Sequence, residues 1–266
     1  MTTFRDLHRP GDPFVLANVW DVGSARMMAA MGAKAVATSS AGFAFTRGVP
    51  DTRIGRAEAI AHGADLVANV AVPVHGDLED GYGPEPADCA DTVTEAALAG
   101  LAGCCIEDVA GDGSPYGARA AAARIEAAAV AARGAARDFV LCARADGVMH
   151  GRYDLDEAIA RLRAFREAGA DVLYCPVPGS ADDLRRIVEA VDAPVNALAV
   201  GPLATLSLAD FAALGVARVS VGAALARATH RVVRDAGGAM LGGDFGGLGG
   251  IAGGDVDAML AQGADA

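Results

Sequence analysis

Short apolar runs alternate along the chain with longer amphipathic segments of helical period, and the alternation repeats roughly every 25 to 35 residues. The apolar runs predict eight strands, at residues 14–18, 35–39, 72–77, 103–107, 139–144, 172–175, 194–198 and 218–221. The amphipathic segments predict helices that begin near Ser24, Arg56, Pro86, Arg119, Leu155, Ala181, Ser207 and Ala223. Strands and helices therefore follow one another in strict alternation.

This alternation indicates the fold class. Eight strand–helix pairs in a chain of 266 residues predict an α/β protein, a (β/α)8 TIM barrel that forms a single domain over residues 1–241. An open doubly wound sheet is the alternative, but residues 18–24, after the first strand, carry no glycine-rich nucleotide turn. Residues 242–266 predict a glycine-rich linker and a short C-terminal helix near residues 255–260.

Composition excludes several partners and chemistries. A net charge of −12 argues against nucleic acid or an acidic membrane surface. No apolar run approaches a membrane span, the first residues do not resemble a secretory signal, and five irregularly spaced cysteines form no disulfide framework. We therefore expect a cytoplasmic protein. The single lysine, Lys34, lies where the chain enters a strand, so Schiff-base and pyridoxal phosphate chemistry are not expected.

One acidic segment is the strongest functional signal in the chain. Residues 77–83 read Asp-Leu-Glu-Asp-Gly-Tyr-Gly and follow directly on the apolar run at 70–74. Three carboxylates at a strand end repel one another unless a cation lies between them. Hard divalent cations such as Mg²⁺ prefer oxygen ligands. The segment therefore predicts a metal site.

Other strand ends carry polar residues as well, and a barrel gathers the carboxyl ends of its strands at one mouth. In chain order they are Asp21, Ser39, Ser40, Asp77, Glu79, Glu107, Asp108, Arg144, Asp146, Cys175 and Asn196. The period of two places Asp77 and Glu79 on one face of their strand. Arg144 lies in an apolar strand, and a buried arginine needs anions nearby. The purely structural interpretation is that it only neutralises Glu107 and Asp77.

Several of these residues also have a purely structural interpretation. Asp108 and Asp146 follow strands, where an acid often caps the next helix. Cys105 and Cys142 lie one layer below the acids, so we expect them to be core residues rather than nucleophiles. His75 should also point inward, and we expect a hydrogen-bonded core residue rather than a ligand, because imidazole is not a preferred partner of Mg²⁺.

At these residues the chain resembles the isocitrate lyase/phosphoenolpyruvate mutase superfamily, over about residues 18–241. The family's hallmark strand reads Asp-x-Asp-x-Gly-Tyr-Gly, and residues 77–83 match it with Glu79 in place of the second Asp. Four further matches lie in register on neighbouring strands: residues 18–26, residues 38–42 followed by 48–51, Glu107-Asp108, and Ala143-Arg144. Each match alone is weak, but five on successive strands are specific.

The resemblance implies roles for individual residues. Asp77 would bind Mg²⁺, or Mn²⁺, most directly, and Asp51, Glu79 and Glu107 would hold its waters. Arg144 would clamp the carboxylate or oxo group of the substrate, and Glu107 and Asp51 join it as implied catalytic residues. The implied substrate-binding set is Trp20, Asp21, Ser39, Ser40, Ala41 and Arg144. Family members make or break a bond next to a 2-oxo acid through an enolate-like species.

The loop after the fourth strand departs from the family. Its lyases carry a Lys-Lys-Cys-Gly-His motif there, and its phosphonate enzymes carry Lys and Asn, whereas residues 109–117 contain none of these. Tyr116 and Asp112 are the loop residues that could close over the site. Isocitrate-type cleavage and phosphoenolpyruvate mutase activity are therefore both in doubt.

The leading hypothesis is a Mg²⁺-dependent carbon–carbon lyase or decarboxylase that acts on a small 2-oxo or 2-hydroxy carboxylate. A phosphoenolpyruvate mutase or phosphonopyruvate hydrolase is one alternative. A barrel that binds 2-oxo acids without transforming them is another. The resemblance also implies a homotetramer in which the last barrel helix, at residues 223–236, exchanges between neighbours.

Overall fold

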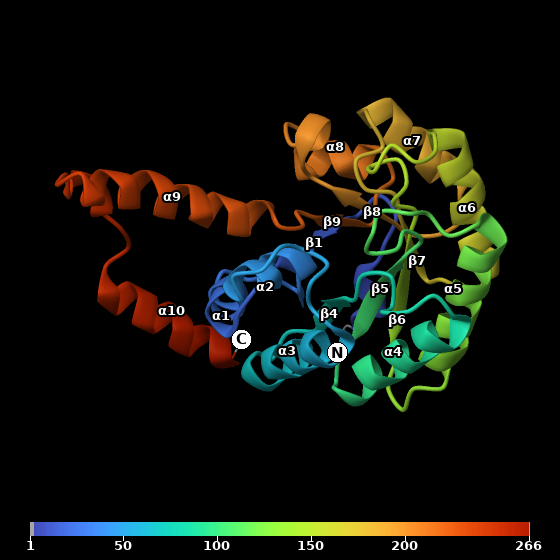
Figure 1. Ribbon diagram of the computed structural model, residues 1–266, viewed down its shortest axis with the longest axis horizontal. Coiled ribbons are helices and arrows are strands. Elements are labelled where there is room, and N and C mark those ends of the chain that lie inside the picture. Colours follow the sequence, from blue (N-terminus) through green and yellow to red (C-terminus); the bar gives the residue numbers. More distant parts are fainter. Residues whose placement is uncertain (1–2, 266) are drawn as a thin grey trace.

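The barrel is built from parallel strands around a nearly closed ring. The computed structural model describes residues 3–265 and places nine parallel strands in the order β1-β9-β8-β7-β6-β5-β4-β3-β2 (Figure 1). Their bounds are β1 Phe14–Val15, β2 Ala17–Asn18, β3 Val36–Ala37, β4 Val74–Asp77, β5 Gly103–Glu107, β6 Val140–Arg144, β7 Val172–Tyr174, β8 Val195–Leu198 and β9 Arg218–Ser220. The predicted (β/α)8 fold class is confirmed.

The first predicted strand is divided into two short pieces. β1 pairs with β9 and β2 pairs with β3, so one continuous segment joins the two edges of the sheet. Leu16 lies between the pieces, and its N–H donates to the Val219 carbonyl over 2.8 Å. Because each half pairs with a different neighbour, this segment closes the ring.

Helices cover the outside of the barrel, and all eight predicted helices are present. Their bounds are α1 Val22–Ala30, α3 Arg56–Asn69, α4 Pro86–Leu98, α5 Ala118–Arg133, α6 Leu155–Glu167, α7 Ala181–Ala190, α8 Leu208–Ala213 and α9 Ala224–Leu241. The sequence did not predict α2, Ser40–Thr46, which begins inside the loop after β3. Ser39 caps it, since its hydroxyl accepts from the Gly42 N–H at 3.1 Å.

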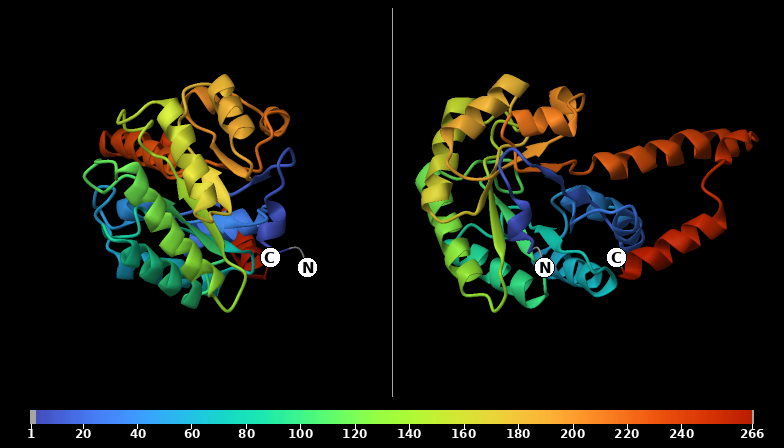
Figure 2. Two further views of the ribbon diagram at one scale, coloured as in Figure 1. Left: turned by 90° about the vertical axis from the view of Figure 1, so that its right-hand side faces the viewer. Right: turned by 180° about the vertical axis from the view of Figure 1, so that it is seen from behind.

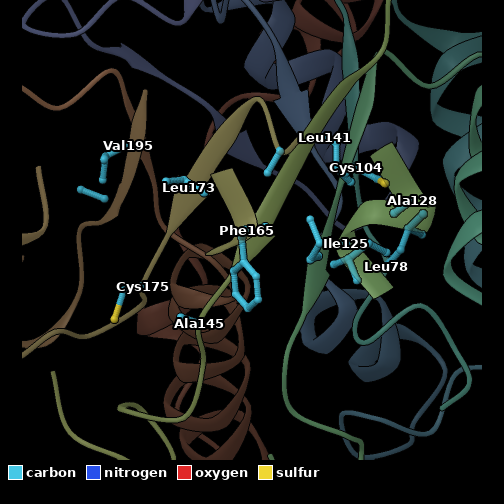
Figure 3. Packing of buried hydrophobic residues seen from close by; sticks show 14 of the residues in the cluster. Leu78, Cys104, Ile125, Ala128, Leu141, Ala145, Phe165, Leu173, Cys175 and Val195 are labelled. Carbon is cyan, nitrogen blue, oxygen red and sulfur yellow. The ribbon is translucent and has the colours of Figure 1, made fainter. Parts of the chain in front are cut away.

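Two apolar layers stabilise the barrel. The outer layer lies between strands and helices, where Ile125 of α5 and Phe165 of α6 pack on residues such as Leu141 and Leu173 (Figure 3). Each such side chain contributes about 1.5–3 kcal/mol by burial. The inner layer fills the lower barrel and includes Phe4, Phe14, Leu16, Val140, Val172 and both Cys105 and Cys142. The two cysteines are buried, as predicted.

The C-terminal helices leave the barrel. α9 projects outward and α10, Gly253–Asp265, returns to pack beside α1 (Figures 1 and 2). The glycine-rich segment between them was predicted as a linker, and α10 is longer than the predicted short helix. Among residues 3–265, no helix is long and apolar enough to cross a membrane.

Replacing Gly263 with alanine should detach α10 from α1. A Cβ atom at Gly263 would lie 1.9 Å from the Arg26 carbonyl oxygen, far inside van der Waals contact. We expect lower thermal stability and faster amide exchange in α10, measured by hydrogen–deuterium exchange. Gly254→Ala is the control in the same helix, because a Cβ there meets no atom within 4 Å. Equal protection of α10 in both variants would contradict this packing.

Candidate functional site

The carboxyl ends of the strands surround a cavity of about 660 Å³. Of the site residues predicted from the sequence, those that line it are Ser39, Ser40, Ala41, Asp51, Asp77, Glu79, Glu107 and Arg144. Trp20 and Asp21 do not line it. Asp21 instead caps α1, accepting from the Ser24 N–H at 2.7 Å. The structure therefore brings the predicted metal and anion-binding residues together and leaves these two outside.

Arg144, at the end of β6, is the centre of the charged cluster. Its Nη1 lies 3.0 Å from Asp77 Oδ1 and 2.6 Å from Glu107 Oε1. Its Nε and Nη2 donate to both oxygens of Asp146 at 3.0 and 2.7 Å, a bidentate pair. One guanidinium thus contacts three carboxylates. The predicted neutralising contacts are present, and Asp146 is an additional partner rather than a helix cap.

Asp77 is held from several sides at the end of β4. Its Oδ2 accepts from the Ser40 N–H at 3.0 Å, and its Oδ1 accepts from the Cys105 thiol at 3.2 Å. Its own N–H donates to the Thr38 hydroxyl over 2.7 Å. These contacts hold the Asp77 carboxylate at the cavity wall. The side chain therefore loses little rotamer freedom when a ligand binds to it.

The acidic cluster around Arg144 carries more negative charge than that one guanidinium balances. Burial, followed by the charges of Asp77 and Asp51, raises the pKa of Glu79 to about 8. Desolvation and then Asp77 raise the pKa of Asp51. Burial raises the pKa of Glu107 well above its ordinary value, against the opposing effect of Arg144. An additional cation would relieve all three shifts.

A divalent cation fits these residues if water completes its coordination. Glu79 is 8% exposed, and its Oε1 is buried without a hydrogen-bond partner. Across residues 3–265, no three His, Cys, Asp or Glu side chains are arranged to hold a metal ion directly. Mg²⁺ commonly retains several waters and takes one or two carboxylates. The oxygen-only donor set suits that mode.

Backbone strain gathers at the same mouth. Thr52, Glu79 and Val177 line the cavity with φ of 64°, 47° and 49°, and Tyr82 of the acidic motif has φ of 60°. The left-handed region is costly for side chains such as these, and most of all for β-branched ones. Strain held in place by the surrounding structure is typical of functional sites.

Asp108 has a structural role that sequence reasoning did not identify. Its Oδ1 accepts from the Asp146 N–H at 2.8 Å, and its Oδ2 accepts from Tyr153 at 2.7 Å and from Arg161 at 3.1 Å. It does not cap a helix, because the next helix, α5, begins after Gly117 and has no side-chain cap. Asp108 therefore positions Asp146, which in turn holds Arg144.

The loop at 109–117 presents mainly backbone and small side chains to the cavity. Val109, Ala110, Gly111 and Gly113 line it, whereas Tyr116 does not. The Tyr116 hydroxyl donates to Asp80 at 2.7 Å, and its ring lies 3.8 Å from the Arg124 guanidinium. Tyr116 thus anchors the loop to the acidic motif, and in this conformation it does not cover the mouth.

Other cavity residues escaped the sequence analysis. His150 lies in the loop after β6, Arg227 in the first turn of α9, and Tyr174 and Arg218 on the barrel interior. The signal in the sequence was a charge at a strand end. His150 and Arg227 lie outside the strands, Arg218 begins β9, and Tyr174 ends β7 without a charge. His75 also differs from expectation, because neither ring nitrogen has a hydrogen-bond partner.

Comparison with known proteins agrees with this geometry. The model of the phosphoenolpyruvate phosphomutase family matches residues 4–241. The chain belongs to this family. The match spans the whole barrel and α9, so the resemblance found on five strand ends is confirmed.

Three relatives place the chain more closely. A putative lyase/mutase of Burkholderia cenocepacia has a solved structure with 46% identity and a TM-score of 0.92, covering 97% of this chain and 94% of that one. An uncharacterized protein of Mycobacterium tuberculosis is 37% identical over 83% of this chain and 81% of its own. The oxaloacetate decarboxylase of Paraburkholderia xenovorans is 33% identical over 69% of this chain and 63% of its own.

Below pH 6.5, His62 should make stability depend on pH. Its ring stacks on Phe43 behind the acidic motif, with centroids 3.8 Å apart, and burial lowers its pKa to about 4. Between pH 6.5 and 4, His62 is protonated in the unfolded chain but stays neutral in the folded protein. Stability is therefore lost as pH falls through this window, by up to about 3 kcal/mol.

Urea unfolding from pH 7 to 4 measures this loss. His62→Phe keeps an aromatic ring against Phe43. In this variant the slope of the unfolding free energy against pH should fall by the equivalent of close to one bound proton. Comparing slopes removes the contribution of the acidic cluster, which both proteins share. Identical slopes in the two proteins would contradict a neutral, buried His62.

Proposed function

We propose that this protein is a Mg²⁺-dependent carbon–carbon lyase or decarboxylase acting on a small 2-oxo or 2-hydroxy carboxylate, and that Mn²⁺ can replace Mg²⁺. The observation that carries the proposal is the single guanidinium of Arg144 among the carboxylates of Asp77, Glu107 and Asp146 at a barrel mouth. The reaction passes through an enolate-like species, and the oxaloacetate decarboxylase relative supports a substrate of this class.

The protein groups bind and orient the substrate. Arg144 donates hydrogen bonds to the carboxylate or oxo oxygen, where negative charge develops as the carbon–carbon bond breaks. The Ala41 amide lies at the cavity wall, where it would hold the substrate carboxylate, whereas the Ser40 amide already donates to Asp77. The Arg144 side chain is nearly buried, with 11% of its surface exposed, and this position keeps water from weakening these contacts.

Asp77 would hold the metal directly, and Asp51, Glu79 and Glu107 would hold it through water. When bound, the ion supplies Lewis-acid stabilisation of the enolate-like charge. Asp146 keeps the Arg144 fork in place from the opposite side, so the guanidinium is already oriented before substrate arrives.

A screen of 2-oxo and 2-hydroxy di- and tricarboxylates with Mg²⁺ tests the proposal, with pyruvate or glyoxylate release as the readout. Oxaloacetate is the first compound to try. We expect turnover of at least one acid that chelators abolish and Mg²⁺ restores. A binding barrel without activity would instead show thermal stabilisation by Mg²⁺ and oxalate but no product from any acid.

Phosphonopyruvate or phosphoenolpyruvate chemistry is the second candidate, favoured by the family match itself. The loop at 109–117 lacks the lysine expected for a phosphoryl group, and the only lysine, Lys34, precedes β3 at the other end of the barrel. Phosphonate turnover followed by ³¹P NMR would establish this activity and displace the lyase proposal.

We also propose a cytoplasmic homotetramer that exchanges α9 between neighbours. α9 projects away from the barrel and exposes Val232, Val233 and Leu241, which are 61%, 69% and 86% exposed in the single chain. All five cysteines are free and buried, which suits a reducing compartment. A monomer by light scattering would refute the assembly.

A further inference from the structure

Arg218 is a buried arginine with no acidic partner. It begins β9 inside the barrel, is 2% exposed, and donates to Asn196 Oδ1 at 2.8 Å. Its other contacts are His8 Nε2 at 3.1 Å and Cys142 Sγ at 3.1 Å. Among residues 3–265 it forms no salt bridge with a carboxylate, unlike Arg144 and Arg161 in the same barrel.

The side chains that contact Arg218 are few, and they carry no negative charge. Burial lowers the pKa of His8 to about 3, so that imidazole carries no charge near neutrality. Burial raises the pKa of the Cys142 thiol, against the opposing effect of Arg218. A guanidinium removed from water among neutral groups carries a large desolvation cost that only an anion offsets well.

His75 provides a second polar group without a partner in the same interior. It is 3% exposed on β4, and neither Nδ1 nor Nε2 has a hydrogen-bond partner. A neutral imidazole offers one N–H donor to a ligand.

Both side chains line the cavity that opens at the mouth. The same cavity is lined by Tyr174 and Asn196 of the barrel wall and by Arg144 above them. The cavity therefore extends from Arg144 to the side chains of Arg218 and His75, whose two imidazole nitrogens are buried in this conformation. Water could satisfy the imidazole, but it cannot neutralise the guanidinium.

We propose that Arg218 and His75 form an anion-binding site inside the barrel, below the catalytic cluster. It takes one monoanionic group, with the guanidinium as charge partner and the imidazole N–H as second donor. That group is either a free halide or the second carboxylate of the substrate.

A purely structural role for Arg218 makes different predictions. In that case its hydrogen bonds to Asn196 and His8 would tie β9 to β8 and to the N-terminal segment across the barrel floor. Removing it would then lower stability equally in every salt. An anion site instead makes stability depend on which anion is present, because only a small one fits.

Halide binding is tested first, and it does not depend on the proposed function. Thermal unfolding is followed in sodium chloride and in sodium gluconate at equal ionic strength, with Mg²⁺ and oxalate saturating the upper site. The wild-type midpoint should rise saturably in chloride only. Arg218→Met should abolish the difference, and Arg227→Met, a rim arginine on the same cavity, should keep it.

Crystals of the wild-type protein soaked in bromide make the test independent of whether the variant folds. An anomalous peak between Arg218 and His75 supports the site. No peak there, together with identical midpoints in chloride and gluconate, overturns it.

The substrate arm rests on the proposed function. If the site takes the second carboxylate, Arg218→Met should weaken binding of a four-carbon diacid such as malate by about tenfold to a hundredfold, as for loss of a charged hydrogen bond. Oxalate affinity should not change, and chloride should compete with malate but not with oxalate. Chloride binding without competition assigns the site to a free halide. Failure of oxalate to bind the wild type would count against the proposed function and leave the halide result standing.

Discussion

Replacing Asp77 with alanine should abolish Mg²⁺ binding and reduce turnover by about a thousandfold or more, since Lewis-acid stabilisation contributes several kcal/mol. Asp77 is the acid best placed to bind a metal directly, because the Ser40 amide, the Cys105 thiol and Arg144 fix its carboxylate at the cavity wall. Isothermal titration with Mg²⁺ and steady-state rates on the substrate found by screening measure both losses.

Asp80→Asn is the matched control within the same motif. The Asp80 carboxylate accepts from the Tyr116 hydroxyl and the Tyr82 N–H and so has a structural role. We expect Mg²⁺ affinity to stay near that of the wild type in this variant. The Asp77 variant should also remain folded without metal, because Glu107 and Asp146 still pair with Arg144. Mg²⁺-dependent activity retained after Asp77→Ala would refute the metal assignment.

The strands and most helices were predictable because their signals are local. Apolar runs give the strands, and caps such as Asp154 and Ser180, whose side chains accept from N–H groups one turn on, give the helix starts. The break at Leu16 was not predictable, because it arises from two halves of one run pairing with different neighbours. α2 was missed because it is short and begins inside a loop that the sequence favoured as substrate-binding backbone.

The candidate site was predictable as far as strand ends determine it. Asp77, Glu79, Glu107 and Arg144 meet because parallel strands in register deliver their ends to one mouth, as Glu107 opposite Arg144 shows. Side chains that reach across the barrel leave no such pattern. The pairing of Asp146 with Arg144, two residues before it, depends on how the chain turns after β6. The isolation of Arg218 depends on neighbours far apart in the sequence, so only the fold reveals either feature.

Replacing Arg161 with methionine should destabilise the protein by about 3–5 kcal/mol, because it leaves the buried charge of Asp108 without its guanidinium. Arg161 is 6% exposed on α6, and its Nη1 also donates to the Tyr116 carbonyl at 2.8 Å. The change should therefore loosen the loop at 109–117 as well. Unfolding in guanidinium chloride measures the loss of stability. The control is Arg163→Met, which replaces an exposed arginine of the same helix and should change stability by no more than about 0.5 kcal/mol.

The double variant Asp108→Asn with Arg161→Met separates charge from packing. Removing both charges should restore part of the stability lost in the single variant, because the uncompensated carboxylate is gone. Turnover should stay below that of the wild type even so, since an amide oxygen at this position accepts from the Asp146 N–H more weakly than a carboxylate and the Arg144 guanidinium loses part of its support. Wild-type stability in Arg161→Met would mean that Asp108 tolerates its charge alone and is free to act at the mouth.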